Sequence, residues 1–543
     1  MKIASIVSTR GQFVVCLAIF VLFGGEDLYA AESPPQGKSP CVDQVYSKKI
    51  RYLWHQRKPY YIEWLKGMGS ESDGFRRKHP YELYDIQLET NNLLRYAEHC
   101  RDLYILEELT SLYILALATL DETEQYAFWY FHNSPRRSIQ KLTRKHKMWL
   151  DRQQPVGDES ILVSSQFLYL VSDAIIVITN IEQAKRTSSM QAFVRQFVPV
   201  LLDHYRRWVL DEVGPFQVRG WGCKFKGKYV ATGMNHHEFI MKKLKRELGD
   251  SYSPKHCNAV TDTDMWIIAG VSNLLAAHKK ERELVQIPSE DFERFISYVR
   301  TGIELLKSRI TYSTLTDFNG KKVEGANFDL GAWDDHPTYA YTGYSTEEFP
   351  RFYLLFNIKR KHSGVGWDLS HARRFVYVFE TLLRNKELLD VEFPTKALME
   401  KLANQLIYGT FNRDFKRPLF ANFMDGTNGW FRVGYNERTG FGYGPWDMSI
   451  AVLTGGYGFW AKYNKDVETV FCALRKMLES NDPDVRKHVT EHYEKNYWLN
   501  YERPYRFNFQ DKENPNTQSV LIRFLPSLSN MRDYNSCGDD ELD

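Results

Sequence analysis

The stretch FERFISYVRTGIELL, residues 292–306, carries the pattern that decides the fold class. Its apolar side chains recur every three or four residues and form one stripe along a helix, made by Phe292, Phe295, Val299, Ile303 and Leu306. The segment 372–383 repeats the spacing. Similar periodic segments lie near 80–100, 102–119, 159–180, 189–212, 235–248, 260–279, 396–409 and 447–463. This pattern predicts a mainly α-helical chain.

Strand-like alternation is scarce, and several connectors between the helical segments are long. Only the segment 519–525 (SVLIRFL) alternates enough to suggest a strand. Three connectors, 213–234, 311–345 and 412–446, are rich in Gly, Trp, Tyr, His and Asp, and long irregular connections inside a domain usually carry function. We therefore expect an all-α fold in which pairs of antiparallel helices stack into a ring or arc, with the long loops forming a cleft at one end.

The N-terminus has the layout of a signal peptide over residues 1–30. Lys2 and Arg10 are followed by a short apolar segment, FVVCLAIFVLFGG at 13–25, and by a small residue at Ala30. The alternative is an uncleaved membrane anchor. We expect a periplasmic or secreted bacterial protein with no stable membrane span after cleavage. The mature chain then divides into a disordered lead-in at 31–44, the helical domain at 45–480 and a C-terminal extension, 481–543, packed on it.

Charge and cysteine content narrow the function classes. The formal net charge is +3, which argues against a nucleic-acid binder and still permits a local basic cleft for an acidic ligand. Six cysteines remain after cleavage and none forms a CxxC pair, so one or two disulfides are expected in an exported protein. Our proposed pair is Cys223 with Cys257. The cysteines are Cys41, Cys100, Cys223, Cys257, Cys472 and Cys537.

Aromatic residues make up 15% of the chain, and many of them lie in the connectors. Sugar rings stack their C–H faces on aromatic rings, while their hydroxyls bind polar neighbours. Each ring taken singly is equally explained by packing of a loop onto the helices, but the group as a whole favours a sugar-binding cleft. The connector aromatics are Trp221, Trp333, Tyr339, Tyr341, Tyr344, Trp430, Tyr435, Tyr443 and Trp446.

A first polar cluster, Asn235-His236-His237-Glu238, opens a helix after a long connector. Asn235 is suited to cap that helix, and one of the two histidines is expected to face a cleft. The order of residues excludes the HExxH zinc motif. The alternative is a capped helix with a solvent-exposed histidine.

A second cluster lies at 331–344 (GAWDDHPTYAYTGY). It brings together Asp334, Asp335, His336, Tyr339, Tyr341 and Tyr344, and such a density of titratable groups favours a site over a spacer. A surface turn with packed tyrosines is the alternative. A metal held by Asp334, Asp335 and His336 is the less favoured interpretation, and we expect neither a metal nor a cofactor.

A third cluster spans 428–436 (NGWFRVGYN) and 440–447 (GFGYGPWD). Arg432 is suited to clamp a substrate carboxylate, Asn436 and the aromatic rings to bind hydroxyls, and Asp447 to bind substrate or to cap the following helix. The alternative is a glycine-rich structural loop. Asp262 and Asp264, at the start of another helix, are better explained as helix-capping carboxylates, although a hydrolase would also use such groups.

The layout of 45–480 resembles the (α/α) toroid enzymes, which include alginate-lyase-like polysaccharide lyases and six-hairpin glycosidases. Asn235-His236 resembles the Asn-His pair of the toroid lyases, and the loop with Tyr339, Tyr341 and Tyr344 resembles the region of their catalytic tyrosine. The sequence departs from the alginate-lyase pattern at His237-Glu238-Phe239, where an aromatic pair is expected. It also has no clear C-terminal β-sandwich.

The resemblance implies β-elimination on an acidic, uronic-acid-containing polysaccharide. Asn235 and Arg432 would neutralise the carboxylate next to the C5 proton. His236 or a tyrosinate would take the proton, and a tyrosine would protonate the departing oxygen. Two alternatives stay open. One is a glycoside hydrolase on the same toroid, with paired carboxylates from Asp262, Asp264, Asp334, Asp335 and Asp447. The other is a glycan-binding envelope protein without catalysis.

Overall fold

The computed structural model describes sixteen stretches of the chain. They are residues 41, 44–69, 81–123, 126–128, 139–141, 146–148, 150–151, 158–159, 161–210, 224–225, 228–229, 234–248, 255–334, 363–432, 443–494 and 508–531. The chain separates into two units, 1–39 and 40–543. All described residues belong to the second unit.

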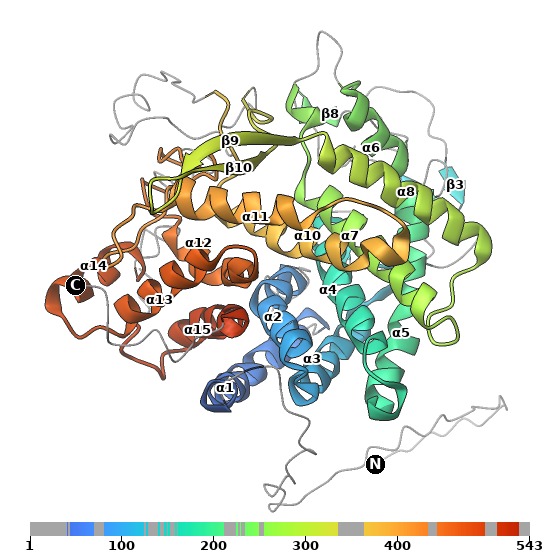
Figure 1. Ribbon diagram of the computed structural model, residues 1–543. Helices are drawn as coiled ribbons and strands as arrows, with labels where there is room; N and C mark the ends of the chain where they lie inside the picture. Colours follow the sequence, from blue (N-terminus) through green and yellow to red (C-terminus); the bar gives the residue numbers. More distant parts are fainter. Residues whose placement is uncertain are drawn as a thin grey trace, which may run out of the picture. The chain divides into compact units, whose positions relative to one another are not determined.

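The described residues are mostly helical, which confirms the all-α class (Figure 1). The longer helices are α1 (Gln44–Gly69), α2 (Tyr81–Cys100), α3 (Leu103–Ile114), α4 (Ile161–Thr179), α5 (Ser188–Tyr205), α6 (His236–Lys245), α7 (Asp262–Lys280), α8 (Ser289–Lys307), α10 (Leu369–Leu389), α11 (Lys396–Asn404), α12 (Ser449–Thr454), α13 (Lys465–Glu479), α14 (Pro483–His492) and α15 (Pro515–Ser527).

Six of these helices pack against one another in a closed order. α2 packs against α4, α4 against α7, α7 against α10, α10 against α12, α12 against α15, and α15 against α2. A further helix flanks most of them, since α3 packs on α2, α5 on α4, α8 on α7 and α1 on α15. The six helices of the closed order are more completely buried than the helices that flank them. Every residue from Val163 to Thr179 of α4 is buried, whereas α8 buries one stripe and leaves its other face open.

Neighbouring helices of the closed order run in the same direction. Near the starts of α7 and α10, Asp262 lies 2.7 Å from Arg374. Near their ends, Asn273 lies 2.7 Å from Arg384. In the same way Gln166, five residues into α4, contacts Gln87 in the second turn of α2. The N-terminal ends of α2, α4, α7 and α10 therefore lie at one end of the helical layer.

The expected strand at 519–525 is wrong, because this segment belongs to α15. Asn514 caps the helix, accepting hydrogen bonds from the next turn, and Pro515 occupies the first helical position, where its missing N–H is harmless. The apolar residues of α15 are buried against α1, α2 and α12. A helix buried on several sides loses its polar face, so its sequence no longer shows helical periodicity.

A β-hairpin lies inside the connector 311–345 and was not expected. Its strands are β9 (Ile310–Thr316) and β10 (Lys322–Phe328), which pair in antiparallel register. Gly320 has a left-handed φ of +82° in the turn, so the Asn319-Gly320 pair was a usable hairpin signal. Only the second half of β10 is buried, and the weak alternation follows from that.

One helix in the described part of the chain, α4, has the length and apolarity to cross a membrane. In this fold 89% of its apolar window is buried inside the protein.

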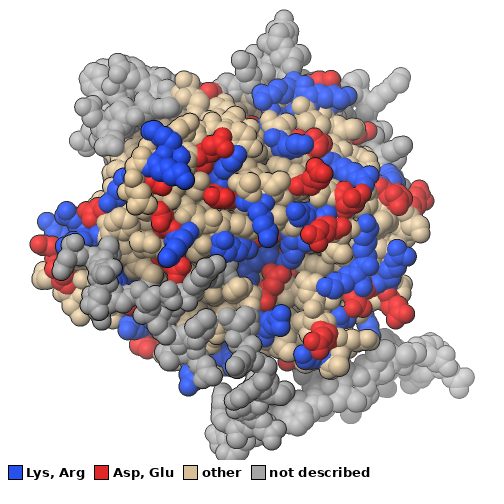
Figure 2. Space-filling model, viewed as in Figure 1, with Lys and Arg blue, Asp and Glu red and all other residues tan. Residues whose placement is uncertain are grey.

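On the face drawn in Figure 2, basic and acidic side chains are interspersed, in keeping with the small net charge of +3.

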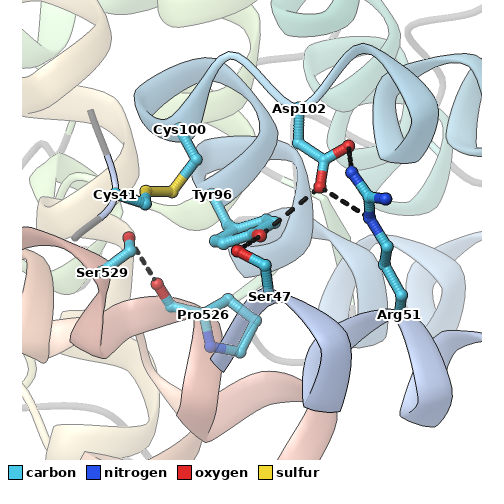
Figure 3. The surroundings of a disulfide bond; sticks show 8 residues. All are labelled: Cys41, Ser47, Arg51, Tyr96, Cys100, Asp102, Pro526 and Ser529. Atoms are coloured by element: carbon cyan, nitrogen blue, oxygen red, sulfur yellow. Dashed lines mark hydrogen bonds and ion pairs between the residues drawn. A yellow bond between two sulfur atoms is a disulfide. The ribbon is translucent and has the colours of Figure 1, made fainter. Parts of the chain in front are cut away.

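A disulfide joins Cys41, just before α1, to Cys100 at the end of α2 (Figure 3). Nearby, Arg51 pairs with Asp102 at 3.0 Å and the Tyr96 hydroxyl donates to Ser47. Sequence spacing alone could not single out this bridge. Cys257 and Cys472 each take part in a disulfide as well. The predicted partner of Cys257, Cys223, lies outside the described residues, so that pair stays a prediction.

Candidate functional site

The residues nominated from the sequence fall into two groups. Those outside the described residues are Trp221, Asp335, His336, Tyr339, Tyr341, Tyr344, Tyr435 and Asn436. Those that the structure places are Asn235, His236, Trp333, Asp334, Trp430, Arg432, Tyr443, Trp446 and Asp447. The placed residues come from three segments, which are taken in turn.

His236 belongs to a buried network that we call the His236 cluster: His236, Lys243, Asp264 and Tyr298. The imidazole Nδ1 lies 2.7 Å from the Tyr298 hydroxyl, and Nε2 lies 2.9 Å from Asp264 Oδ1. Lys243 Nζ donates to Asp264 Oδ2 at 2.5 Å. His236 is 0% exposed, so it is not the histidine that faces a cleft; His237 is half-buried, and the expectation for that residue stays a prediction. The cluster instead joins α6, α7 and α8.

Electrostatics in the His236 cluster agree with a structural role. Burial lowers the pKa of His236, which keeps the ring neutral between its two partners. Burial alone would raise the pKa of Asp264, but the charge of Lys243 and the hydrogen bond with His236 hold it well below its usual range. Asp264 also accepts a hydrogen bond from the backbone N–H of Thr261 at 2.7 Å, as expected for a helix-capping carboxylate.

Asn235 caps α6, as the sequence predicts. Its side-chain oxygen accepts the backbone N–H of Glu238 at 2.9 Å, and the Glu238 carboxylate accepts the N–H of Asn235 in return. The amide oxygen is therefore committed to the helix start. This commitment weakens Asn235 as a ligand for a substrate carboxylate.

Trp333 and Asp334 make packing contacts. The Trp333 ring stacks on His256 with 6.4 Å between centroids. Asp334 accepts the backbone N–H of Gly364 at 3.0 Å, next to Gly331 at a left-handed φ of +70°. These contacts match the alternative interpretation of the second cluster, a turn with packed aromatics, for the part of it that is described.

The third cluster folds into a small bridge before α12. Phe431 and Tyr443 exchange backbone hydrogen bonds at 2.9 and 2.8 Å. Asp447 was expected to bind substrate or cap the next helix. Its carboxylate accepts the N–H of Gly444 at 2.6 Å, while the residue before α12 is Met448 and gives no side-chain cap. The capping expectation for Asp447 is therefore wrong.

Arg432 faces the start of α10. Its Nη2 lies 3.3 Å from Nε2 of His371, whose Nδ1 lies 2.7 Å from Asp368. Asp368 caps α10 through the backbone N–H groups of Ser370 and His371. Burial would raise the pKa of Asp368, but His371, Ser370 and Arg432 lower it to about 2. An ionised carboxylate thus fixes the orientation of the imidazole.

One turn further into α10, Arg374 ties three helices together. Its Nη2 donates to Asp262 of α7 at 2.7 Å and to the Tyr84 hydroxyl of α2 at 3.1 Å, while Nη1 donates to the Ser370 carbonyl. Arg374 is 1% exposed. Since all these residues lie near the starts of their helices, the contact gathers the N-terminal ends of α2, α7 and α10.

Arg373 differs from its neighbour. It makes no hydrogen bond or ion pair with any residue that the structure describes. Burial and the adjacent charge of Arg374, together with Arg523 of α15, lower its pKa. Arg373 in turn lowers the pKa of Asp85, so this carboxyl group acts as a counter-charge without forming an ion pair. A guanidinium held near two others, with no ion pair among the described residues, is suited to accept an anion.

Two carboxylic acids of α2 accompany Arg373. Burial raises the pKa of Glu82 to about 7, and the nearby Asp85 adds to the rise. The Glu82 Oε2 atom is buried and has no hydrogen-bond donor among the described residues. Burial and Glu89 raise the pKa of Asp85 to about 6, although its side chain reaches solvent.

We call Glu82, Asp85, Arg373, Arg374 and Arg523 the α10 cluster. It combines guanidinium groups with two carboxyl groups whose pKa values are raised by burial to about 7 and about 6, and His371 lies on the adjacent turn. Acid–base chemistry on a negatively charged ligand needs these groups. None of the five was predicted from the sequence as a site residue. The Arg373-Arg374 pair inside a helical apolar stripe was the available signal, because charges seldom occupy such positions without a partner.

Among the residues that the structure describes, no group of three His, Cys, Asp or Glu side chains is arranged to hold a metal ion. No protein-family model, no curated protein and no solved structure matches the chain.

Proposed function

We propose that the six helices of the closed order form the inner ring of an (α/α) toroid, with the flanking helices outside it. The cyclic packing of α2, α4, α7, α10, α12 and α15 supports this arrangement. So does the parallel direction of its neighbouring members. In such a ring the helix starts surround one opening, and the α10 cluster lies there.

We propose further that the protein is a polysaccharide lyase that cleaves a uronic-acid-containing polymer by β-elimination. The observation that carries the proposal is Arg373, which has no ion pair among the described residues, beside two carboxyl groups with raised pKa values. Elimination requires that the uronate carboxylate be neutralised, since only then does the C5 proton become acidic. Arg373 supplies that charge, and Arg523 adds to the local positive potential.

The remaining groups suit the two proton transfers. His371, oriented by Asp368, takes the C5 proton through Nε2, once the substrate displaces the Arg432 N–H that this atom accepts at 3.3 Å. The C4–O4 bond then breaks as the C4–C5 double bond forms, and Glu82 gives its proton to the departing O4. Atoms and charges balance, because one proton leaves carbon and one reaches oxygen. These roles replace those first given to Asn235 and His236, which are engaged inside the fold.

A glycoside hydrolase is the second candidate, and a specific observation favours it. Glu82 and Asp85 lie three residues apart on one helix, and their pKa values, about 7 and about 6, suit an acid and a base at neutral pH. In that case Asp85 would activate water while Glu82 protonates the leaving oxygen.

A panel of uronate polymers tests the proposal on the mature protein. Elimination creates a conjugated double bond, so ultraviolet absorbance rises with turnover, whereas hydrolysis releases reducing ends without that absorbance. We expect absorbance to rise with at least one polymer and to be lost in His371→Ala. Reducing ends without absorbance would transfer the assignment to the hydrolase. Binding without either product would indicate a glycan-binding protein.

We also propose export to the periplasm or the exterior. The tripartite sequence at 1–30 supports this location, and a disulfide between Cys41 and Cys100 is compatible with an oxidising compartment. N-terminal sequencing of protein recovered from the periplasm of a bacterial host tests the cleavage site near Ala30.

A further inference from the structure

A cavity of about 510 Å³ lies in the other half of the helical layer. It is lined by the end of α2, the middle and end of α10, and the short helical segment η7 (Tyr457–Lys462). Its volume is in the range of small-molecule sites, roughly 300–1,000 Å³. Tyr377 lines this cavity, and its hydroxyl donates to Asn92 at 2.9 Å. Arg373 of the α10 cluster lies one helical turn earlier in α10.

The cavity exists because one helix of the closed order is short. α12 ends at Thr454, after six residues, whereas the neighbouring α10 has 21. The chain then turns at Gly456, whose φ is +76° and where a Cβ atom would come within 2.6 Å of Asn92. The second half of α10 is therefore not covered by α12, and its side chains at Glu380 and Leu383 face the cavity.

The floor of the cavity is already neutral. Arg95 and Arg384 both line it, and they pair with Glu98 and Asp173 at distances between 2.6 and 3.3 Å. Two guanidinium groups thus face two carboxylates. This network gives the site a rigid base, and its charges leave none to spare for a ligand.

The walls of the cavity, in contrast, contain polar and charged groups that are available to a ligand. Glu380 accepts from Lys462 at 2.8 Å through Oε2, and Tyr463, which also lines the cavity, interacts with the same carboxylate; the Glu380 Oε1 atom is buried and has no donor at bonding distance among the described residues. Lys396 lines the cavity, is exposed, and forms no ion pair within the part of the chain that the structure describes. Leu383 and Phe459 add an apolar wall.

We propose that this cavity is a second binding site, for a small acidic sugar. A uronate monosaccharide has a group for each of these side chains. Its carboxylate pairs with Lys396, and one of its hydroxyls donates to Glu380 Oε1. Its C–H face packs on Leu383 and Phe459. The excess of one positive charge matches a ligand with one negative charge. The proposal does not require catalysis at the α10 cluster.

Titration calorimetry with D-glucuronate tests the site in the mature protein. Arg373→Ala serves as the background, because it weakens any binding at the α10 cluster. In this background we expect binding of glucuronate, about tenfold weaker binding after Lys396→Ala or Glu380→Gln, and no change after Lys465→Ala. Lys465 is a matched control, since it is exposed and does not line the cavity.

Two ligands sharpen the assignment. D-glucose lacks the carboxylate and should bind at least tenfold more weakly than glucuronate. Inorganic phosphate lacks the apolar face and should bind more weakly as well; equal binding would make this a free-anion site and overturn the sugar assignment. Glucuronate binding that is lost in Arg373→Ala, or that is unchanged by both cavity variants, would overturn the cavity site itself. Failure of the cavity site is distinguishable from failure of the proposed lyase activity, because turnover of the polymer is measured in a separate experiment.

Discussion

Two polar clusters contain similar residue types, and they differ in how fully their groups are used. In the His236 cluster, His236, Lys243 and Asp264 are all buried, and each contacts a partner within 2.9 Å. In the α10 cluster, Arg373 has no ion pair among the described residues and Glu82 has a buried oxygen without a donor. Buried polar groups are normally satisfied. A polar cluster whose groups all have hydrogen-bond or charge partners therefore indicates a structural role. A cluster with groups that lack such partners indicates where a ligand binds.

The largest effect is expected when the satisfied cluster is broken. Asp264→Ala leaves Lys243 charged and buried with no counter-charge, and it also removes a cap of α7. Removing one member of such a pair destabilises by about 3–5 kcal/mol. We expect a loss of this size in the free energy of unfolding, measured by chemical denaturation, with normal turnover for each molecule that stays folded.

Glu304→Ala is the control for Asp264→Ala, because Glu304 is exposed and lies 4.0 Å from Lys307. It should change the free energy of unfolding by less than about 0.5 kcal/mol. If Asp264→Ala were equally mild, the His236 cluster would not be the structural element described here.

Replacing Arg373 is expected to lower activity and to leave stability unchanged or slightly higher. Arg373→Ala should lower kcat/KM on a uronate polymer by about 10²–10³-fold, the usual loss when a preorganised charge in the transition state is removed. Stability should stay the same or rise slightly, since the change relieves repulsion with Arg374 and Arg523. Arg373→Lys should recover part of the activity, because it keeps the charge but not the fork of donors.

Arg282→Ala is the matched control, as Arg282 is exposed on the connector after α7. Its kcat/KM should equal that of the wild-type protein. A stable Arg373→Ala protein with full turnover would remove the observation on which the proposed function rests.

His236 gives a third, smaller test, and it separates the two clusters directly. His236→Ala leaves the Tyr298 hydroxyl and one oxygen of Asp264 without their partners inside the protein. An unsatisfied buried group costs about 1–3 kcal/mol, so the melting temperature should fall. Turnover per folded molecule should not. A loss of turnover without a loss of stability would restore His236 as a catalytic residue.

Most helices, and the cap at Asn235, were predictable from sequence because they depend on local chemistry. The stripe in 292–306 and the Asn235 cap needed only neighbours three or four residues away. The strand predicted at 519–525 failed for the opposite reason. There the surroundings of α15 decide burial on several faces, and no local pattern records them.

The candidate site was harder to predict, since its members are far apart in the chain. Glu82, Arg373 and Arg523 come from three helices that only the closed packing order brings to one place. His236 was nominated for its residue type, but the decisive property was its exposure, which depends on the positions of α7 and α8. Titratable residues in a sequence therefore identify candidates, and the hydrogen bonds that they lack select among them.

The smallest effect concerns pH and tests Glu82. Its pKa is raised from 4.5 to about 7 by burial, so between these values the folded protein keeps a proton that the unfolded chain releases. The unfolded state then binds fewer protons, and stability contributed by this group falls as pH rises from about 4.5 to 7. Glu82→Gln cannot titrate. The free energy of unfolding of the variant minus that of the wild-type protein should therefore increase across this window and level off above it.

Asp85, whose pKa is raised to about 6, titrates in both proteins and largely cancels in this difference. Activity supplies the second readout. If Glu82 is the proton donor, wild-type turnover falls above about pH 7 as the donor ionises, and Glu82→Gln is slow at every pH with that limb absent. A stability difference that stays constant with pH would mean that Glu82 is not desolvated. An unchanged alkaline limb in Glu82→Gln would assign the proton donor to another group, and Tyr84, which contacts Arg374, would be the next to replace by Phe.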